Sequence, residues 1–165
     1  MPELFETGRV SDAVFSPDRL WRYRLWRCWN PDLPAVLFIG LNPSTADETE
    51  PDPTITRCMD FAERWGFGTY LMGNLYAFRS TKPKGMKATT DPIGPENDQH
   101  LADMIKQAFK VIVAWGSHKG IDDRAKQVLE MIREPYCLKL TKEGYPQHPL
   151  YIRGDTVPIR YPGRH

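Results

Sequence analysis

The chain is organised around the stretch Leu33-Pro-Ala-Val-Leu-Phe-Ile-Gly-Leu-Asn-Pro-Ser-Thr-Ala-Asp-Glu48. Its apolar run, residues 35–39, is typical of a strand that is buried on both faces. The run ends at Gly40, which permits a close backbone approach, and Pro43 pushes Asn42 towards an extended conformation. Because α/β proteins usually place their chemistry where a buried parallel strand ends in a polar loop, we expect the functional site here.

Length and composition narrow the class of protein. The 165 residues, of which 41% are hydrophobic and 26% charged, fit one domain, residues 1–165, with a sizeable core. A net charge of +1 gives the protein no strong overall electrostatic attraction to nucleic acid or to an anionic membrane. The three cysteines, Cys28, Cys58 and Cys137, form no CxxC pair, which argues against a zinc or iron–sulfur site. Their odd number and the absence of an apolar leader or membrane-length run indicate a cytoplasmic protein without a membrane partner.

Residues 13–29 alternate with period two and predict a β-hairpin. One predicted face carries Trp21, Tyr23 and Leu25, and the other carries Arg22, Arg24 and Trp26. Two interpretations of these arginines remain open: a solvated face of an edge strand, or a stripe that contacts phosphates.

Beyond the opening stretch, strands and helices alternate. Asp52 and Pro53 are a plausible N-cap and first residue of a helix that stops at Gly66. Apolar periodicity then predicts further strands over 70–78, 111–115 and 136–140, and helices over 97–109 and from Asp122 or Asp123 onwards. This order predicts an α/β fold of three layers, α/β/α, around a central, mainly parallel four-stranded sheet, with the N-terminal hairpin added to it.

Several polar residues follow the ends of these strands. Asn42, the segment from Asn74 to Arg79, the pair Trp115-Gly116 and His148 should meet at one edge of a parallel sheet. Two amides and an imidazole can read the donor and acceptor pattern of a nucleobase and can stabilise developing negative charge. The cationic loop 79–87, with Lys82, Lys84 and Lys87, could hold phosphates beside that edge.

These segments carry two resemblances. Gly40-Leu41-Asn42-Pro43, Asn74-Leu-Tyr-Ala-Phe-Arg-Ser-Thr81, Val111-Ile-Val-Ala-Trp-Gly116 and His148-Pro149 resemble, in order and spacing, motifs of the uracil-DNA glycosylase superfamily. With Pro43-Ser-Thr-Ala-Asp47 and Asp91-Pro-Ile-Gly-Pro-Glu-Asn-Asp98, residues 13–160 also resemble DUF1643, a bacterial and phage family of unknown function.

The glycosylase resemblance implies a uracil-DNA-glycosylase-like fold and an extrahelical base held at this edge. Asn42 would position the attacking water or the sugar, Asn74 would read the base, and His148 would hydrogen-bond its carbonyl. It implies catalysis with water and no cofactor, and it implies nucleic acid, expected to be DNA, or a nucleobase or nucleotide as the binding partner. The catalytic residues that we expect are Asn42, His148 and Asp47. The expected substrate-binding residues are Gly40, Leu41, Pro43, Ser44, Asn74, Arg79, Trp115 and Gly116, and either Phe67 or Trp115 would stack on the base.

Structural roles stay open for the same residues. Asn42 could cap its own turn, Asn74 could be a buried structural amide, and Asn97-Asp98 could cap a helix or form a lid. The acidic residues Asp47, Glu48 and Asp52 could be loop and cap residues, a general base or Mg²⁺ ligands. Three hypotheses follow: a glycosylase-like hydrolase, a non-catalytic or differently catalytic nucleobase-binding or nucleotide-binding protein, and a metal-dependent hydrolase.

Overall fold

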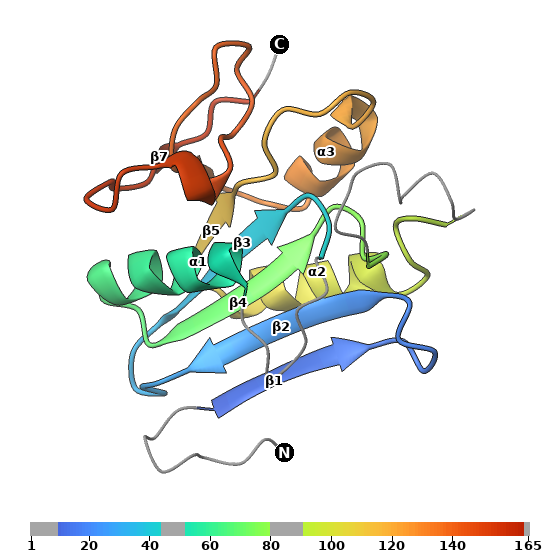
Figure 1. Ribbon diagram of the computed structural model, residues 1–165, viewed down its shortest axis with the longest axis horizontal. Coiled ribbons are helices and arrows are strands. Elements are labelled where there is room, and N and C mark those ends of the chain that lie inside the picture. Colours follow the sequence, from blue (N-terminus) through green and yellow to red (C-terminus); the bar gives the residue numbers. More distant parts are fainter. Residues whose placement is uncertain (1–9, 44–51, 80–90, 164–165) are drawn as a thin grey trace.

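The computed structural model describes residues 10–43, 52–79 and 91–163, and it has a mixed α/β architecture (Figure 1). One sheet has the strand order β1-β2-β4-β3-β5-β6-β7. The strands are β1 Val10–Phe15, β2 Arg22–Cys28, β3 Ala35–Gly40, β4 Thr69–Asn74, β5 Lys110–Val113, β6 Pro135–Cys137 and β7 Ile159–Arg160. The segment expected as strand 70–78 therefore ends at Asn74, and the C-terminal tail contributes a strand of its own.

The seven strands pair in both directions. The pairs β4–β3, β3–β5 and β5–β6 are parallel. The pairs β1–β2, β2–β4 and β6–β7 are antiparallel. The prediction of a central, mainly parallel four-stranded sheet with an added N-terminal hairpin is thus corrected to one larger, mixed sheet, because β2 pairs directly with β4 and β7 pairs with β6.

Helices cover both faces of this sheet. The helix α1, Pro53–Arg64, packs on one face, where Phe38, Tyr70 and Ile112 meet Phe61 and other apolar residues. The helices α2, Asn97–Gln107, and α3, Asp122–Leu129, pack on the opposite face against the alternate strand residues such as Leu37 and Val113. A short 3₁₀ helix, η2, Pro149–Tyr151, follows the last parallel strand. None of the helices in the described part of the chain combines the length and hydropathy that a membrane span requires.

The interpretation of β2 as a solvated edge is wrong. Since β2 lies between β1 and β4, its arginines are not all solvent-exposed, and Arg22 and Arg27 are buried. The alternation of residues 21–26 is also interrupted. Val14 pairs with Arg24 and Phe15 pairs with Arg22, so the register of β1 and β2 shifts at Tyr23.

Of the predicted N-caps, the one that starts α1 is confirmed, and those that start α2 and α3 are wrong. The Asp52 side chain accepts a hydrogen bond from the Ile55 backbone N–H at 2.8 Å, and Pro53 begins α1, which confirms that predicted cap. The predicted cap at Asn97 is wrong, because Glu96 precedes α2 and makes no side-chain cap. Similarly, Ile121 precedes α3, so the predicted cap by Asp122 or Asp123 is wrong.

Candidate functional site

A cavity of about 250 Å³ lies at the carboxyl ends of the parallel strands. Residues of the adjacent strands β2, β4 and β3, with Ala114 directly after β5, form its floor, and the start of α1 and two loops cover it. Its volume is at the small end of ligand sites. The lining residues are Arg22, Phe38, Gly40, Leu41, Asn42, Asp52, Thr54, Ile55, Cys58, Met72, Asn74, Ala114, His118, His148 and Pro149. The structure thus brings Asn42, Asn74 and His148 to one space from three separate segments.

Asn74 ends β4 and is almost fully buried, with 1% of its surface exposed. Its Oδ1 has no hydrogen-bond partner among the described residues. Gly40 of the neighbouring strand makes room for it, because a Cβ at that position would lie 3.0 Å from the Asn74 Oδ1 and 2.8 Å from Met72 Cε. A buried acceptor without a partner costs about 1–3 kcal/mol, which favours a ligand that supplies a donor.

Two residues from the opposite face hold the end of β4 in place. The Asn97 amide donates to the backbone carbonyls of Asn74 and Leu75 at 3.0 and 3.3 Å. The Arg124 Nε donates to the Leu75 carbonyl at 2.8 Å, and its Nη2 pairs with Asp98 at 2.7 Å. Asn97 is completely buried, so it is a positioning residue beneath the cavity and neither a cap nor a lid.

The loop after β3 lies across the end of β4. The backbone N–H groups of Leu75 and Tyr76 donate to the carbonyls of Gly40 and Leu41 at 2.9 and 3.0 Å. Asn42 is half-buried on the cavity wall, and its Nδ2 donates to the Pro43 carbonyl at 3.3 Å. Gly40, Leu41 and Asn42 line the cavity as expected, whereas Pro43 lies just outside its lining.

Two histidines stand at the mouth of the cavity. The Nδ1 of His148 accepts a hydrogen bond from the Leu150 backbone N–H at 3.3 Å, so a neutral imidazole carries its proton on Nε2. Burial, and then the proximity of His118, lower the pKa of His148, while Asp52 opposes the shift. Burial also lowers the pKa of His118. Both imidazoles are therefore neutral at neutral pH, and His148 can act as a hydrogen-bond donor.

Asp52 contributes a half-buried carboxylate to the wall. It caps α1 and also interacts electrostatically with Arg22 and His148. Beneath it, burial raises the pKa of the Cys58 thiol and the pKa of the Tyr70 hydroxyl, so neither group ionises near neutral pH. Within the described residues, no three His, Cys, Asp or Glu side chains are grouped as metal ligands would be.

Arg22 is a charged residue of the wall that the sequence analysis did not select for this site. Its side chain is 2% exposed and lines the cavity together with Phe38 and Met72. Burial lowers its pKa to about 10, which leaves the guanidinium charged at neutral pH. The alternation of residues 21–26 did not indicate that Arg22 faces the cavity, because the orientation of Arg22 depends on the register shift at Tyr23.

Other expected residues lie elsewhere. Trp115 is buried in the core on the α3 side and lines a different pocket, so the structure does not bring it together with Asn42, Asn74 and His148. Phe67 packs in the core on the α1 face and is likewise not part of the cavity. Arg79 lies over the Phe15 ring, 4.7 Å from its centroid, and donates to the Arg19 carbonyl at 3.2 Å. The positions of Ser44, Asp47, Glu48, Lys82, Lys84 and Lys87 lie outside the described residues.

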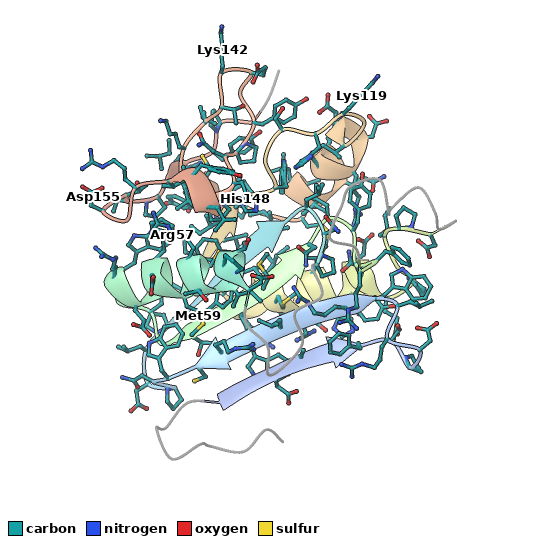
Figure 2. All side chains as sticks on the ribbon, viewed as in Figure 1. Arg57, Met59, Lys119, Lys142, His148 and Asp155 are labelled. Carbon is teal, nitrogen blue, oxygen red and sulfur yellow. The ribbon has the colours of Figure 1, made fainter. Side chains whose placement is uncertain are left out.

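A second, more open groove of about 680 Å³ continues outward from the cavity. The two share Thr54, His118 and His148. Gly116, with a φ of 77°, forms the turn that lines the groove next to His118. Figure 2 shows His148 near the first turn of α1, whereas the Lys142 side chain points outward from the tip of its loop. The groove thus offers hydroxyl and amide groups, from Ser117, Thr141 and Gln147, just beyond the two imidazoles.

A loop on the α1 side supports His148. Arg57 of α1 donates to the Ile152 carbonyl, and the Trp65 indole donates to the Thr156 carbonyl at 3.0 Å. In Figure 2, Arg57 lies on α1 and His148 lies immediately before η2, the short helix that packs on α1. This packing fixes the position of η2 and therefore of the imidazole that precedes it.

The family profile described as "protein of unknown function (DUF1643)" matches residues 22–150, which is most of the chain. The chain belongs to the DUF1643 family. The DUF1643 match begins at Arg22 and ends two residues after His148, so it contains every described residue that lines the cavity. No curated protein and no solved structure matched the chain. The DUF1643 description assigns no activity, and the resemblance to uracil-DNA glycosylases stays a prediction.

Proposed function

We propose that this DUF1643 protein binds a nucleobase in the inner cavity and hydrolyses its N-glycosidic bond, in DNA or in a smaller nucleotide. The observation that carries the proposal is the meeting of Asn42, Asn74 and His148 in one small cavity, with Asn74 Oδ1 buried and unpartnered among the described residues. Apolar floor residues such as Phe38 and Met72 suit the ring faces of a base, and the amides suit its polar edge.

Each residue then has a role that follows from its place. The Asn74 amide at the inner end contacts the donor and acceptor edge of the base. The His148 Nε2–H donates to a base carbonyl on which negative charge develops. The outer groove holds the sugar, and Asn42, at the junction, orients the sugar or the attacking water.

The proposed reaction is a hydrolysis at the anomeric carbon. The C1′–N bond breaks and its electron pair stays on the base, while a water oxygen forms the new bond to C1′. That water gives up a proton, which the Asp52 carboxylate on the cavity wall accepts. The departing base takes a proton from solvent. Loss of one positioned donor in such a site costs about 10²–10³-fold in rate.

Oligonucleotides that carry uracil, deaminated bases or hypermodified bases test the activity. We expect at least one of them to yield an abasic site that alkali cleaves, and we expect His148→Ala and Asn74→Ala to reduce the rate about 10²-fold or more. Matched controls are His100→Ala and Asn30→Ala, which change the same residue types outside the cavity and should retain the rate.

The same samples separate the alternatives. If no oligonucleotide gives an abasic site but free bases or nucleotides raise the melting temperature, the protein is a nucleobase-binding protein without glycosylase activity. Loss of all activity in EDTA would favour a metal-dependent hydrolase that uses Asp52 with Asp47 and Glu48. If no substrate is cleaved and no base or nucleotide shifts the melting temperature, the proposed function is wrong.

A further inference from the structure

We propose that the junction between the inner cavity and the outer groove binds the 2′-hydroxyl of a ribose, so that the site prefers ribonucleosides to 2′-deoxyribonucleosides. This inference rests on the proposed function and specifies the sugar of its substrate. It gives a binding role to His118 and Thr54, neither of which was among the expected site residues.

Three side chains line both the cavity and the groove, and they come from three different segments. Thr54 lies in the first turn of α1, His118 follows β5, and His148 precedes η2. Both histidines lie close to Gly116, because a Cβ at that glycine would be 3.4 Å from the His118 Nε2 and 3.8 Å from the His148 Cβ. A ligand that occupies both spaces therefore has to pass these three side chains.

The two imidazoles present opposite hydrogen-bonding groups to the junction. The His148 Nδ1 accepts from the Leu150 backbone N–H, so the His148 Nε2–H is a donor. The His118 ring instead donates to the backbone carbonyl of Trp115. Burial lowers the pKa of His118, which keeps this ring neutral at neutral pH. Because a neutral imidazole that donates through one nitrogen has an acceptor at the other, His118 brings an acceptor to the junction.

A sugar hydroxyl matches this combination better than a phosphodiester does. A hydroxyl can donate to the His118 nitrogen and also accept from the Thr54 hydroxyl or the His148 N–H. A phosphodiester offers acceptors only, so it supplies no donor to His118. The three side chains that line both spaces are uncharged at neutral pH, and Figure 2 shows the Lys119 and Lys142 side chains pointing outward. The junction is therefore suited to a neutral group that both donates and accepts.

The covalent structure of a nucleoside decides which hydroxyl reaches this point. With the base in the inner cavity, the glycosidic bond crosses the junction and places C1′ there. The 2′-oxygen is attached to the carbon next to C1′, whereas the 3′- and 5′-oxygens lie farther out, in the open groove. A 2′-deoxyribose leaves the acceptor of His118 without this donor, and a site that hydrogen-bonds a hydroxyl rejects the analogue that lacks it.

Isothermal titration calorimetry with uracil, uridine, 2′-deoxyuridine and 3′-deoxyuridine tests the inference. In the wild-type protein the Kd of uridine should be about tenfold below that of 2′-deoxyuridine, as expected for the loss of one hydrogen bond, and within about threefold of that of 3′-deoxyuridine. His118→Ala should bring the ratio of the 2′-deoxyuridine and uridine Kd values close to one. Thr54→Val, which is nearly isosteric, should lower that ratio at least about twofold. Both variants should leave the Kd of free uracil unchanged.

His100→Ala and Thr56→Val are the matched controls, because they change the same residue types outside the cavity and the groove. They should keep the wild-type ratio. Equal Kd values for uridine and 2′-deoxyuridine in the wild-type protein would overturn the inference, as would a ratio that survives both His118→Ala and Thr54→Val. A loss of affinity for 3′-deoxyuridine and not for 2′-deoxyuridine would overturn it as well.

Free uracil separates this inference from the proposed function. If uracil binds but none of the three nucleosides does, the inference is overturned and base binding in the inner cavity stands. Failure of all four compounds to bind would contradict the proposed function and this inference together.

Discussion

The ends of β4 and β5 are two regions that look alike in the sequence and differ in the structure. Each is a buried parallel strand, and each delivers a residue that was expected in the site. Asn74 faces the α1 side and lines the cavity, whereas Trp115 faces the α3 side and is packed in the core. The neighbour of Trp115, Ala114, lines the cavity in its place. A shared sheet edge therefore brings strand ends together, but the two-residue period of each strand decides which side chains reach the site.

The largest expected effect is a loss of stability when Trp115, the core residue of this comparison, is truncated. Trp115→Ala should lower the free energy of unfolding by about 3–5 kcal/mol, since it removes a large, fully buried side chain. Urea denaturation followed by circular dichroism measures it. Phe109→Ala, which truncates an aromatic that is 74% exposed, is the control and should change stability by less than about 1 kcal/mol. Comparable losses in the two variants would show that Trp115 is not a core residue.

The next effect comes from the residue that holds the end of β4. Asn97→Ala leaves the buried carbonyls of Asn74 and Leu75 with fewer donors and should cost about 1–3 kcal/mol of unfolding free energy. It should also weaken uracil binding, because the end of β4 loses its anchor. Gln99→Ala, on an exposed face of the same helix, should stay within about 0.5 kcal/mol of wild type and keep its affinity. An Asn97→Ala protein as stable as Gln99→Ala would contradict the anchoring role.

On the cavity side, Asn74→Ala should weaken ligand binding and leave stability nearly unchanged, whereas Trp115→Ala mainly lowers stability. Asn74→Ala removes a buried acceptor that has no partner among the described residues, and the relief of that cost offsets the packing that is lost with the side chain, so the free energy of unfolding should fall by less than about 1 kcal/mol. The Kd for uracil should rise about tenfold or more, measured by calorimetry. A large loss of stability with unchanged affinity would show that Asn74 is a structural amide, which belongs to the core as Trp115 does.

The smallest effect concerns pH. Burial lowers the pKa values of His100, His118 and His148 from the usual 6.5. A lowered folded-state pKa means that the unfolded chain binds these protons more readily. Stability is therefore complete above about pH 6.5 and falls as the pH drops through the lowered values. Melting temperatures between pH 7.5 and 5 measure this, and His100→Gln should flatten the curve. A melting temperature that rises on acidification would contradict the sign.

Much of this fold could be predicted because its signals are local. The apolar run before Gly40, the Asp52-Pro53 helix start and the strand at residues 111–113 are recognisable from spacing and residue type alone. The convergence of Asn42, Asn74 and His148 followed from topology. Val111, Val113 and Trp115 are spaced two residues apart, which indicates that all three face the same side of the sheet, in the core. The sequence analysis did not use this spacing.

The residues that were missed depend on tertiary pairing. The burial of Arg22 requires β2 to pair with β4 and its register with β1 to shift at Tyr23, and neither property is encoded in the alternation of residues 21–26. Asn97 looked like a cap because Asn and Asp are typical there. Its amide instead satisfies the carbonyls of a strand that lies more than twenty residues earlier in the chain.

A crystal structure of the protein with uracil tests the central claim most directly. We expect the pyrimidine ring in the inner cavity, over the Phe38 and Met72 floor, with its polar edge hydrogen-bonded to the Asn74 side chain and a carbonyl within reach of His148 Nε2. Uracil bound in the pocket beside Trp115, or only in the outer groove, would contradict the claim that Asn42, Asn74 and His148 form a base-binding site.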